Sequence, residues 1–217
     1  MPGAKVTIKV KICGITNLDD ALDAIEAGAD ALGFVFYPPS PRYIPPEILR
    51  QWIGQLPPFV TKVGVFVDEK LDNIIQISEL CRIVVVQLHG HESTDLCKQV
   101  PKPVIKAFRL RSEEDLATLL PYSNNTVSAL LLDSYSEKIP GGTGRSFDWN
   151  LAKQAKAYGR IILAGGLSPE NVRQAVIEVQ PYAVDVSTGV ELSLGKKDKT
   201  LMKRFVKEAN GASEEAK

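Results

Sequence analysis

The stretch VTIKVKICGIT, residues 6–16, decides the fold. Its β-branched residues predict a strand over 6–12. Apolar side chains then recur at helical spacing over 18–27. Asn17 suits the N-cap of this helix, and Gly28 suits its C-terminal stop. The stretch therefore predicts a strand followed directly by a helix.

The same alternation of strand and helix continues to the end of the 217-residue chain. The predicted pairs are 6–12 with 18–27, 31–36 with 46–55, 62–67 with 71–80, 83–88 with 93–99, 104–108 with 113–120, 127–132 with 149–158, 160–164 with 169–179, and 183–186 with 199–209. Eight such pairs predict an α/β fold, a single-domain (β/α)8 TIM barrel over 1–217. We expect residues 211–217 to fray. A doubly wound sheet is the alternative, but it favours a glycine-rich turn after the first strand.

Composition excludes several classes of protein. Lysine plus arginine equals aspartate plus glutamate, so the formal net charge is zero, unlike the basic surface of a nucleic-acid binder. The sequence lacks an apolar run of membrane-spanning length and a start of signal-peptide form. The chain has three cysteines, an odd number, and their spacing does not match a disulfide framework. This indicates a reducing compartment. We therefore expect a cytoplasmic protein that binds neither nucleic acid nor membrane.

Cys13 stands at the carboxyl end of the first predicted strand. In a (β/α)8 barrel, the residues at that end of the strands carry the chemistry. The following helix N-terminus would lower the thiol pKa and favour thiolate. Cys13 is thus a candidate base, and an ordinary packed thiol is the alternative.

Two small-residue turns follow the last two strands, at Gly165-Gly166 and at Ser187-Thr188-Gly189. Ser168 suits a helix N-cap, and Pro169 suits the first helical position. Barrels often bind phosphate between these two loops, through backbone N–H groups and a helix dipole. The turns predict a phosphate site, and plain tight turns are the alternative.

Asp133 ends a very apolar strand, so we expect it at the rim of the barrel. Partial desolvation and nearby anions would raise its pKa, as a general acid requires. A helix-cap or loop aspartate is the alternative. The connection 134–147, with Gly141-Gly142-Thr143-Gly144, is a candidate lid or a plain surface loop.

Arg42 lies in a proline-stiffened loop after the second strand and suits a carboxylate or phosphate. A surface arginine stacked on Tyr43 is the alternative. A metal site needs three or four convergent ligands, and the chain has only two histidines, so we expect no metal site. We expect His89 to line the barrel mouth and His91 to face solvent. Cys81 and Cys97 fall in or beside helical patterns, and we expect them to be packed, inert thiols.

Several blocks together resemble the phosphoribosylanthranilate isomerases of tryptophan biosynthesis, from about Val10 to Val206. The blocks are KICGIT at 11–16, GFVFYP at 33–38, SPRYI at 40–44, VGVF at 63–66, VQLHG at 86–90, LLD at 131–133, GGTG at 141–144, FDW at 147–149, GGLSPENV at 165–172 and VDVSTGVE at 184–191. Two positions depart from the family pattern: Arg145 replaces an expected lysine, and Leu194 replaces a common proline.

The resemblance implies an Amadori rearrangement of N-(5-phosphoribosyl)anthranilate to 1-(2-carboxyphenylamino)-1-deoxyribulose 5-phosphate, with no metal or organic cofactor. It implies Cys13 as general base, Asp133 as general acid and Arg42 as the ligand of the anthranilate carboxylate. For this chemistry we expect the acid's pKa to be raised and the thiol's to be lowered. The resemblance further implies polar pocket contacts from His89 and Asp185, and phosphate contacts from Gly165, Gly166, Ser187, Thr188 and Gly189.

Two alternative functions remain at this point. The related isomerase of histidine biosynthesis has an aspartate at the position of Cys13. A non-catalytic sugar-phosphate-binding barrel would keep the glycine turns without needing Cys13 and Asp133 together. The expected partner is a small phosphorylated substrate, and the chain would act as a monomer or homodimer.

Overall fold

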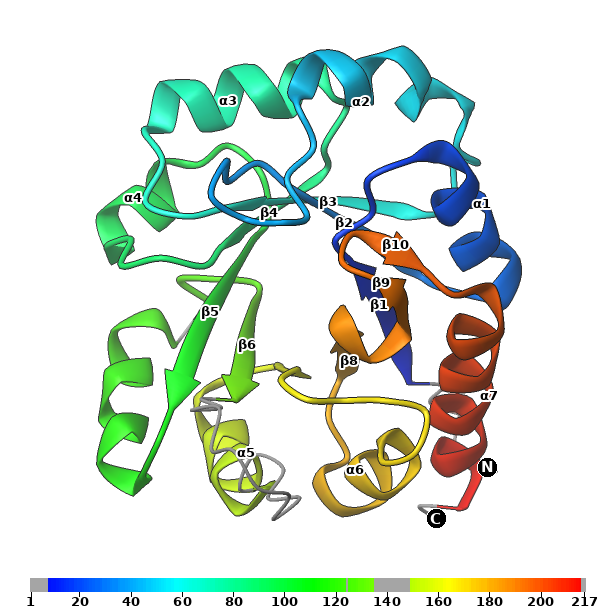
Figure 1. The fold of residues 1–217 in the computed structure, drawn as a ribbon. Helices are drawn as coiled ribbons and strands as arrows, with labels where there is room; N and C mark the ends of the chain where they lie inside the picture. The colour runs from blue at the N-terminus through cyan, green and yellow to red at the C-terminus, as the bar shows by residue number, and fades with distance from the viewer. Residues whose placement is uncertain (1–7, 124, 135–148, 216–217) are drawn as a thin grey trace, which may run out of the picture.

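The computed structural model describes residues 8–123, 125–134 and 149–215. Eight parallel strands form a closed barrel in chain order, and β8 pairs with β1 to close it (Figure 1). The predicted (β/α)8 barrel is therefore confirmed. Its strands are β1 (Lys9–Cys13), β2 (Ala31–Val35), β3 (Thr61–Phe66), β4 (Val85–Leu88), β5 (Val104–Leu110), β6 (Ala129–Ser134), β7 (Ile161–Leu163) and β8 (Ala183–Val186).

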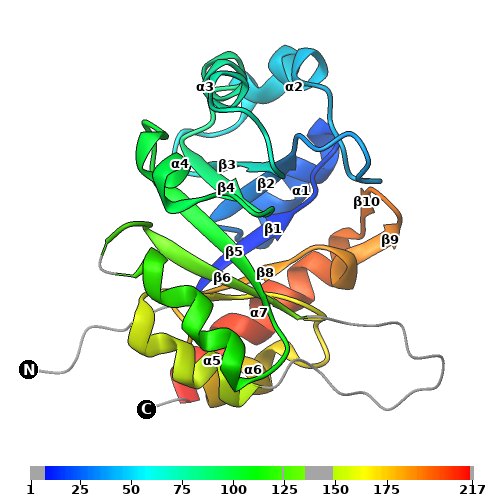
Figure 2. The same ribbon diagram turned by 90° about the vertical axis from the view of Figure 1, so that its left-hand side faces the viewer.

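Helices surround the barrel and cover the outer face of its strands (Figures 1 and 2). The α-helices are α1 (Leu18–Ala27), α2 (Pro46–Trp52), α3 (Leu71–Leu80), α4 (Thr94–Gln99), α5 (Trp149–Ala155), α6 (Val172–Val179) and α7 (Lys199–Glu215). The 3-10 helices are η1 (Ile53–Gln55), η2 (Glu113–Tyr122), η3 (Lys156–Tyr158) and η4 (Thr188–Val190).

The first strand–helix unit follows its local sequence closely. The Asn17 side chain accepts a hydrogen bond from the Asp20 backbone N–H at 2.8 Å and caps α1. Gly28 ends the helix in the left-handed conformation with φ of 100°. Both predicted caps of this helix are thus confirmed.

Three segments differ from the expected elements. The connection after β5 is the 3-10 helix η2 rather than an α-helix, and Pro121 lies inside it. Helix α6 begins at Val172 rather than at Pro169, because Ser168 closes a turn first: its backbone carbonyl accepts from Val172 N at 3.0 Å. A short hairpin, β9 (Glu191–Ser193) with β10 (Lys196–Lys197), stands between β8 and α7.

The C-terminal helix is longer than the sequence pattern predicts. Helix α7 runs on to Glu215, and Ala212 is fully buried. The described part of the segment from Gly211 onward is therefore helical. An added side chain at Gly211 would meet the Arg173 guanidinium at 3.0 Å, so this turn packs closely on α6.

The barrel interior is apolar at its centre and polar toward the carboxyl ends of the strands. Successive strand residues point to opposite faces, so every second residue faces inward. Val63, Ile105 and Leu131 belong to the apolar inner layer. Lys11 and Gln87 are polar and buried in the same interior. The larger hydrophobic cluster packs between strands and helices.

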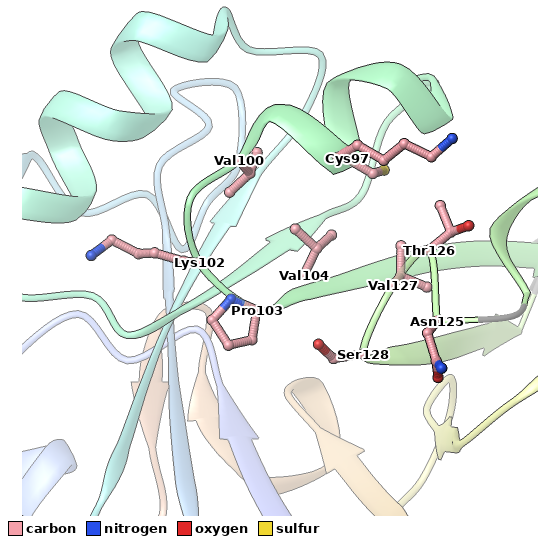
Figure 3. A pocket seen from close by; sticks show the side chains of 10 residues that line it. Cys97, Val100, Lys102, Pro103, Val104, Asn125, Thr126, Val127 and Ser128 are labelled. Carbon is pink, nitrogen blue, oxygen red and sulfur yellow. The ribbon is translucent and has the colours of Figure 1, made fainter.

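Two surface hollows lie away from the carboxyl ends of the strands. One of about 440 Å³ lies on the outer wall beside α4, where Cys97, Lys102 and Thr126 line it (Figure 3). Another of about 390 Å³ opens at the amino ends, beside the fully exposed Phe59. Within the described residues, no helix has the length and apolar character needed to cross a membrane.

Candidate active site

The predicted site residues lie at one end of the barrel. Cys13 is the last residue of β1, Asp133 lies near the end of β6, and Asp185 lies in β8. His89 follows β4 directly, and Arg42 lies in the loop after β2. Because parallel strands share one carboxyl end, these side chains surround a common mouth.

Three neighbouring side chains form what we call the base cluster: Lys11, Cys13 and Asp185. Lys11 and Asp185 are register partners in the β1–β8 pairing. The Lys11 ammonium donates to Asp185 Oδ1 at 2.7 Å, and both side chains are at least nine-tenths buried. Register places Gly33 of β2 directly beside Cys13 on the other side.

The environment of Cys13 raises its pKa, contrary to the expectation from sequence. Burial is the largest cause, and the nearby Lys11 ammonium opposes it. Helix α1 begins only at Leu18, and Asn17 already caps its first turn. The predicted lowering of the thiol pKa is therefore wrong.

Arg42 crosses the mouth toward the hairpin that follows β8. Its Nε and Nη2 donate to the two carboxylate oxygens of Glu191, each at 2.7 Å, and Nη2 also donates to Thr188 Oγ1 at 2.9 Å. This bidentate pair is nearly buried on the Glu191 side, which is 3% exposed. Gly14 makes the crossing possible, because an added side chain there would meet Arg42 Cδ at 2.6 Å.

Lys197 of β10 contacts the same carboxylate from the other side. Its fully buried ammonium donates to Glu191 Oε1 at 3.0 Å and to the Ser187 carbonyl at 3.1 Å. Burial lowers the pKa of Lys197, and the Glu191 charge partly offsets this. Burial raises the pKa of Glu191, but hydrogen bonds from Arg42 and the charge of Lys197 outweigh it, so the net direction is down.

The two predicted phosphate turns lie against each other. Gly165 and Gly166 have φ of 77° and 68°, a backbone that favours glycine. An added side chain at Gly189 would collide with the Leu167 carbonyl oxygen, so the loops after β7 and β8 touch through backbone. The Asn171 amide donates to the Gly166 carbonyl at 2.9 Å and holds the first turn.

A second group, which we call the acid side, consists of Gln87, His89 and Asp133. Asp133 has the same strand parity as Ala129 and Leu131, which line the barrel interior. The nearest His89 nitrogen, Nε2, lies 3.4 Å from Asp133 Oδ2. This separation is long for a hydrogen bond, and Nε2 makes none within the described residues.

Gln87 positions the ring of His89. Its amide nitrogen lies 3.2 Å from His89 Nδ1. With Nδ1 as acceptor, the proton of the neutral ring is on Nε2 and faces Asp133. The Gln87 carbonyl oxygen has no hydrogen-bond partner among the described residues, although the residue is 1% exposed.

A buried ion pair supports the loop that carries His89. Lys106 donates to the Gly90 carbonyl at 2.8 Å and pairs with Glu92 at 3.2 Å. Glu92 in turn accepts from the Gly90 and Asp68 backbone N–H groups. His91, next along this loop, has a 98% exposed side chain, as predicted.

The remaining predicted residues are two cysteines, the candidate lid, and the two positions that depart from the family pattern. Cys81 and Cys97 are buried, as expected, and burial raises the pKa of Cys81 to about 11. The candidate lid over 134–147, apart from its first residue, and Arg145 lie outside the described residues. Leu194, the second departure, is exposed at the tip of the β9–β10 hairpin.

Sequence reasoning missed four charged or polar residues of the site: Lys11, Gln87, Glu191 and Lys197. A signal for Lys11 was available, because it shares strand parity with Cys13 and must face inward with it. Strand parity gives no such signal for Glu191 or Lys197, because their positions depend on a hairpin of very short strands. Glu191 was marked only as the last residue of the family block at 184–191.

Comparisons with known proteins agree with this geometry. Residues 10–208 match the family model "N-(5'phosphoribosyl)anthranilate (PRA) isomerase". An N-(5'-phosphoribosyl)anthranilate isomerase of Geobacter sp. (strain M21) is 58% identical over 205 residues, covering 94% of this chain and 99% of that protein.

Solved structures give the same result. The crystal structure of phosphoribosyl anthranilate isomerase from Thermotoga maritima has a TM-score of 0.88 and 47% identity, covering 94% of this chain and 99% of that one. A structure of a phosphoribosyl anthranilate isomerase in complex with reduced 1-(o-carboxyphenylamino)-1-deoxyribulose 5-phosphate has a TM-score of 0.85 and 45% identity, with the same coverage. The chain therefore belongs to the phosphoribosylanthranilate isomerase family.

Proposed function

We propose that this chain isomerises N-(5-phosphoribosyl)anthranilate to 1-(2-carboxyphenylamino)-1-deoxyribulose 5-phosphate in tryptophan biosynthesis, with Cys13 as general base and Asp133 as general acid. One observation carries the proposal: a thiol and a carboxyl both occupy inward-facing positions at the carboxyl end of the same barrel. Membership of the isomerase family and the likeness to a structure with a reduced product analogue support it.

The reaction begins at the acid side. Asp133, protonated, donates its proton to the ribose ring oxygen, and the C1–O bond breaks as the anilino nitrogen forms a protonated imine. The Nε2 proton of His89 faces the carboxylate that Asp133 becomes. A donor placed toward developing negative charge stabilises the transition state.

The base cluster completes the reaction. The Cys13 thiolate removes the proton from C2, and that electron pair neutralises the imine and forms an enolamine. The enolamine then tautomerises to the amino ketone, with no net gain or loss of atoms or electrons. Each acid or base is worth about 100- to 10,000-fold in rate.

Cationic and backbone groups would bind the substrate's two anions. The turns at Gly165-Gly166 and Ser187-Thr188-Gly189 supply backbone N–H groups for the phosphate. Arg42 is the proposed ligand of the anthranilate carboxylate. Since Glu191 already engages its Nε and Nη2, the substrate would bind through Nη1 or displace Glu191.

A fluorescence assay that follows loss of phosphoribosylanthranilate tests the proposal. We expect rapid conversion by the wild type, and a loss of about 100-fold or more in turnover for Cys13→Ser and for Asp133→Asn, with unchanged circular dichroism. Near-wild-type turnover in either variant would remove that residue from its role. No conversion by the wild type would move the function to another substrate.

We also propose a cytoplasmic enzyme that is a monomer or homodimer. One structural relative is described as mutually generated monomers of a dimeric phosphoribosylanthranilate isomerase from Thermotoga maritima. Light scattering on the purified chain would give its molar mass, and a larger assembly than a dimer would contradict the proposal.

A further inference from the structure

Lys11 is a buried cation that the proposed acid–base steps do not use. The residue is 3% exposed, and its ammonium lies in the barrel interior against Asp185. Burying an ion pair carries a large desolvation cost, and well-packed apolar residues often replace such pairs without loss of stability. Core packing alone therefore gives no reason for a lysine here.

The Lys11 ammonium and the Cys13 thiol occupy one small space. They face inward from alternate positions of β1, and Gly33 lies beside them on β2. An added side chain at Gly33 would lie 2.6 Å from Cys13 Sγ and 3.1 Å from Lys11 Nζ. The missing side chain at Gly33 thus makes the room in which the thiol and the ammonium meet.

Charged groups from several elements act on the thiol. Lys11 and Asp185 come from β1 and β8, Lys197 comes from β10, and Arg42 comes from the loop after β2. Arg42 and Lys197 both bind Glu191, so much of their charge is already neutralised. Lys11 is the cation with the strongest influence on the thiol, and it outweighs Asp185.

Lys11 keeps its proton in this position. Burial lowers its pKa, but Asp185 and the thiol more than offset this, so the net direction is upward. It is therefore an ammonium over the pH range in which Cys13 ionises, and a hydrogen-bond donor rather than a competing base.

We propose that Lys11 is the positioning residue that stabilises the thiolate of Cys13, with Asp185 fixing the Lys11 ammonium beside the sulfur. The inference rests on the proposed role of Cys13 as base. When Cys13 releases its proton to solvent, an ammonium N–H of Lys11 donates to the thiolate sulfur. Asp185 thereby gains a role inside the base cluster rather than as a substrate contact.

Alkylation of Cys13 tests the proposal without using any substrate. The rate of reaction with iodoacetamide would be measured against pH, with mass spectrometry identifying Cys13 as the labelled cysteine. Because only thiolate reacts, Lys11→Met should slow alkylation about tenfold or more at about pH 8. Asp185→Asn keeps a side-chain oxygen that can accept from the Lys11 ammonium, but it removes the anion that disfavours thiolate, so this variant should be alkylated faster than the wild type.

Lys9→Met is the matched control. Lys9 has the same strand parity as Lys11 but forms a half-exposed pair with Asp30 at 2.7 Å. We expect the wild-type alkylation profile for this variant. Wild-type profiles for both lysine variants would overturn the proposal.

The double variant Lys11→Met, Asp185→Asn covers the case in which Lys11→Met fails to fold, because it leaves no unpaired buried charge. We expect slower alkylation than in the wild type, since the influence of Lys11 on the thiol exceeds that of Asp185. An unchanged rate in this folded variant would also overturn the proposal.

Turnover of phosphoribosylanthranilate separates the two proposals. If the wild type converts the substrate but its kcat/KM–pH profile is the same in Lys11→Met, the role of Lys11 is wrong and the proposed function stands. If alkylation shifts as expected but no chain converts the substrate, the proposed function fails and the electrostatic role of Lys11 stands.

Discussion

The two halves of the barrel mouth are built differently. On the β1–β8 side, Lys11 and Asp185 pair at 2.7 Å deep in the interior. On the β4–β6 side, His89 and Asp133 stand 3.4 Å apart and are each about a quarter exposed. Fixed, paired charges surround Cys13, the proposed base, whereas His89 lies loosely beside Asp133, the proposed acid, within the part of the chain that the structure describes. From this contrast we expect the surroundings of the Cys13 thiol to be fixed before substrate binds, and those of the Asp133 carboxyl to adjust on binding.

The largest expected effect comes from filling the space on the base side. In Gly33→Ala, the new methyl group would collide with Cys13 Sγ at 2.6 Å and press on Lys11 Nζ at 3.1 Å. Displacing a base by about 1 Å costs about 100-fold in turnover, and the overpacking costs about 1–3 kcal/mol of stability. Steady-state kinetics and urea unfolding measure the two effects.

Gly54→Ala is the control for this change. Its added carbon would meet only the end of the flexible Arg82 side chain, at 3.2 Å, and we expect wild-type turnover. A Gly33→Ala enzyme with near-wild-type turnover would show that the base side tolerates disorder, and the contrast between the two halves would fail.

Glu191→Gln should have the next largest effect, mainly on stability. The change leaves the fully buried Lys197 ammonium and the Arg42 guanidinium without their anion. Breaking a buried pair costs about 3–5 kcal/mol. Urea unfolding near neutral pH measures this, with the exposed Arg204→Met change as control, for which we expect less than about 1 kcal/mol.

The same variant predicts a dependence on pH. Since the net pKa of Glu191 is lowered in the folded chain, its contribution is complete above the ordinary carboxyl pKa and is lost as pH falls through the folded value. The stability difference between wild type and Glu191→Gln should therefore shrink in acid. A difference that stays constant or grows as pH falls contradicts the assigned charge state.

Gln87→Leu should have the smallest effect, because the acid side is loosely organised. It removes a buried carbonyl oxygen that lacks a partner among the described residues, and it frees the His89 ring. We expect stability within about 1 kcal/mol of the wild type, and turnover reduced by less than about tenfold. A loss as large as that of Gly33→Ala would show that the acid side is as tightly prepared as the base side.

Local signals predicted much of the fold. The caps of α1 at Asn17 and Gly28 were predictable because each acts through bonds within a few residues. The barrel was predictable because eight strand–helix alternations leave few other ways to bury the apolar strands. Cys13 and Asp133 were assigned to the mouth by strand position and resemblance.

The remaining features depend on contacts between distant parts of the chain. The predicted direction of the Cys13 pKa shift was wrong because burial raises this pKa by more than the Lys11 ammonium lowers it. The ion pairs of Glu191 could not be predicted from the sequence, because its two cationic partners meet it only once the β9–β10 hairpin forms. The start of α6 moved because Ser168 closes a turn before the helix begins.

The pairing of Lys11 with Asp185 spans 174 positions of the chain. A ribosome synthesises β1 first and β8 almost last, at about 5–20 residues per second. We expect Lys11 to lack its Asp185 partner, and Cys13 to remain accessible to water, until β8 emerges and docks. The environment of the proposed base would therefore form when β8 pairs with β1 and the barrel closes. The alkylation rate of Cys13 would then report when β8 docks, both during refolding of the purified protein and on a nascent chain.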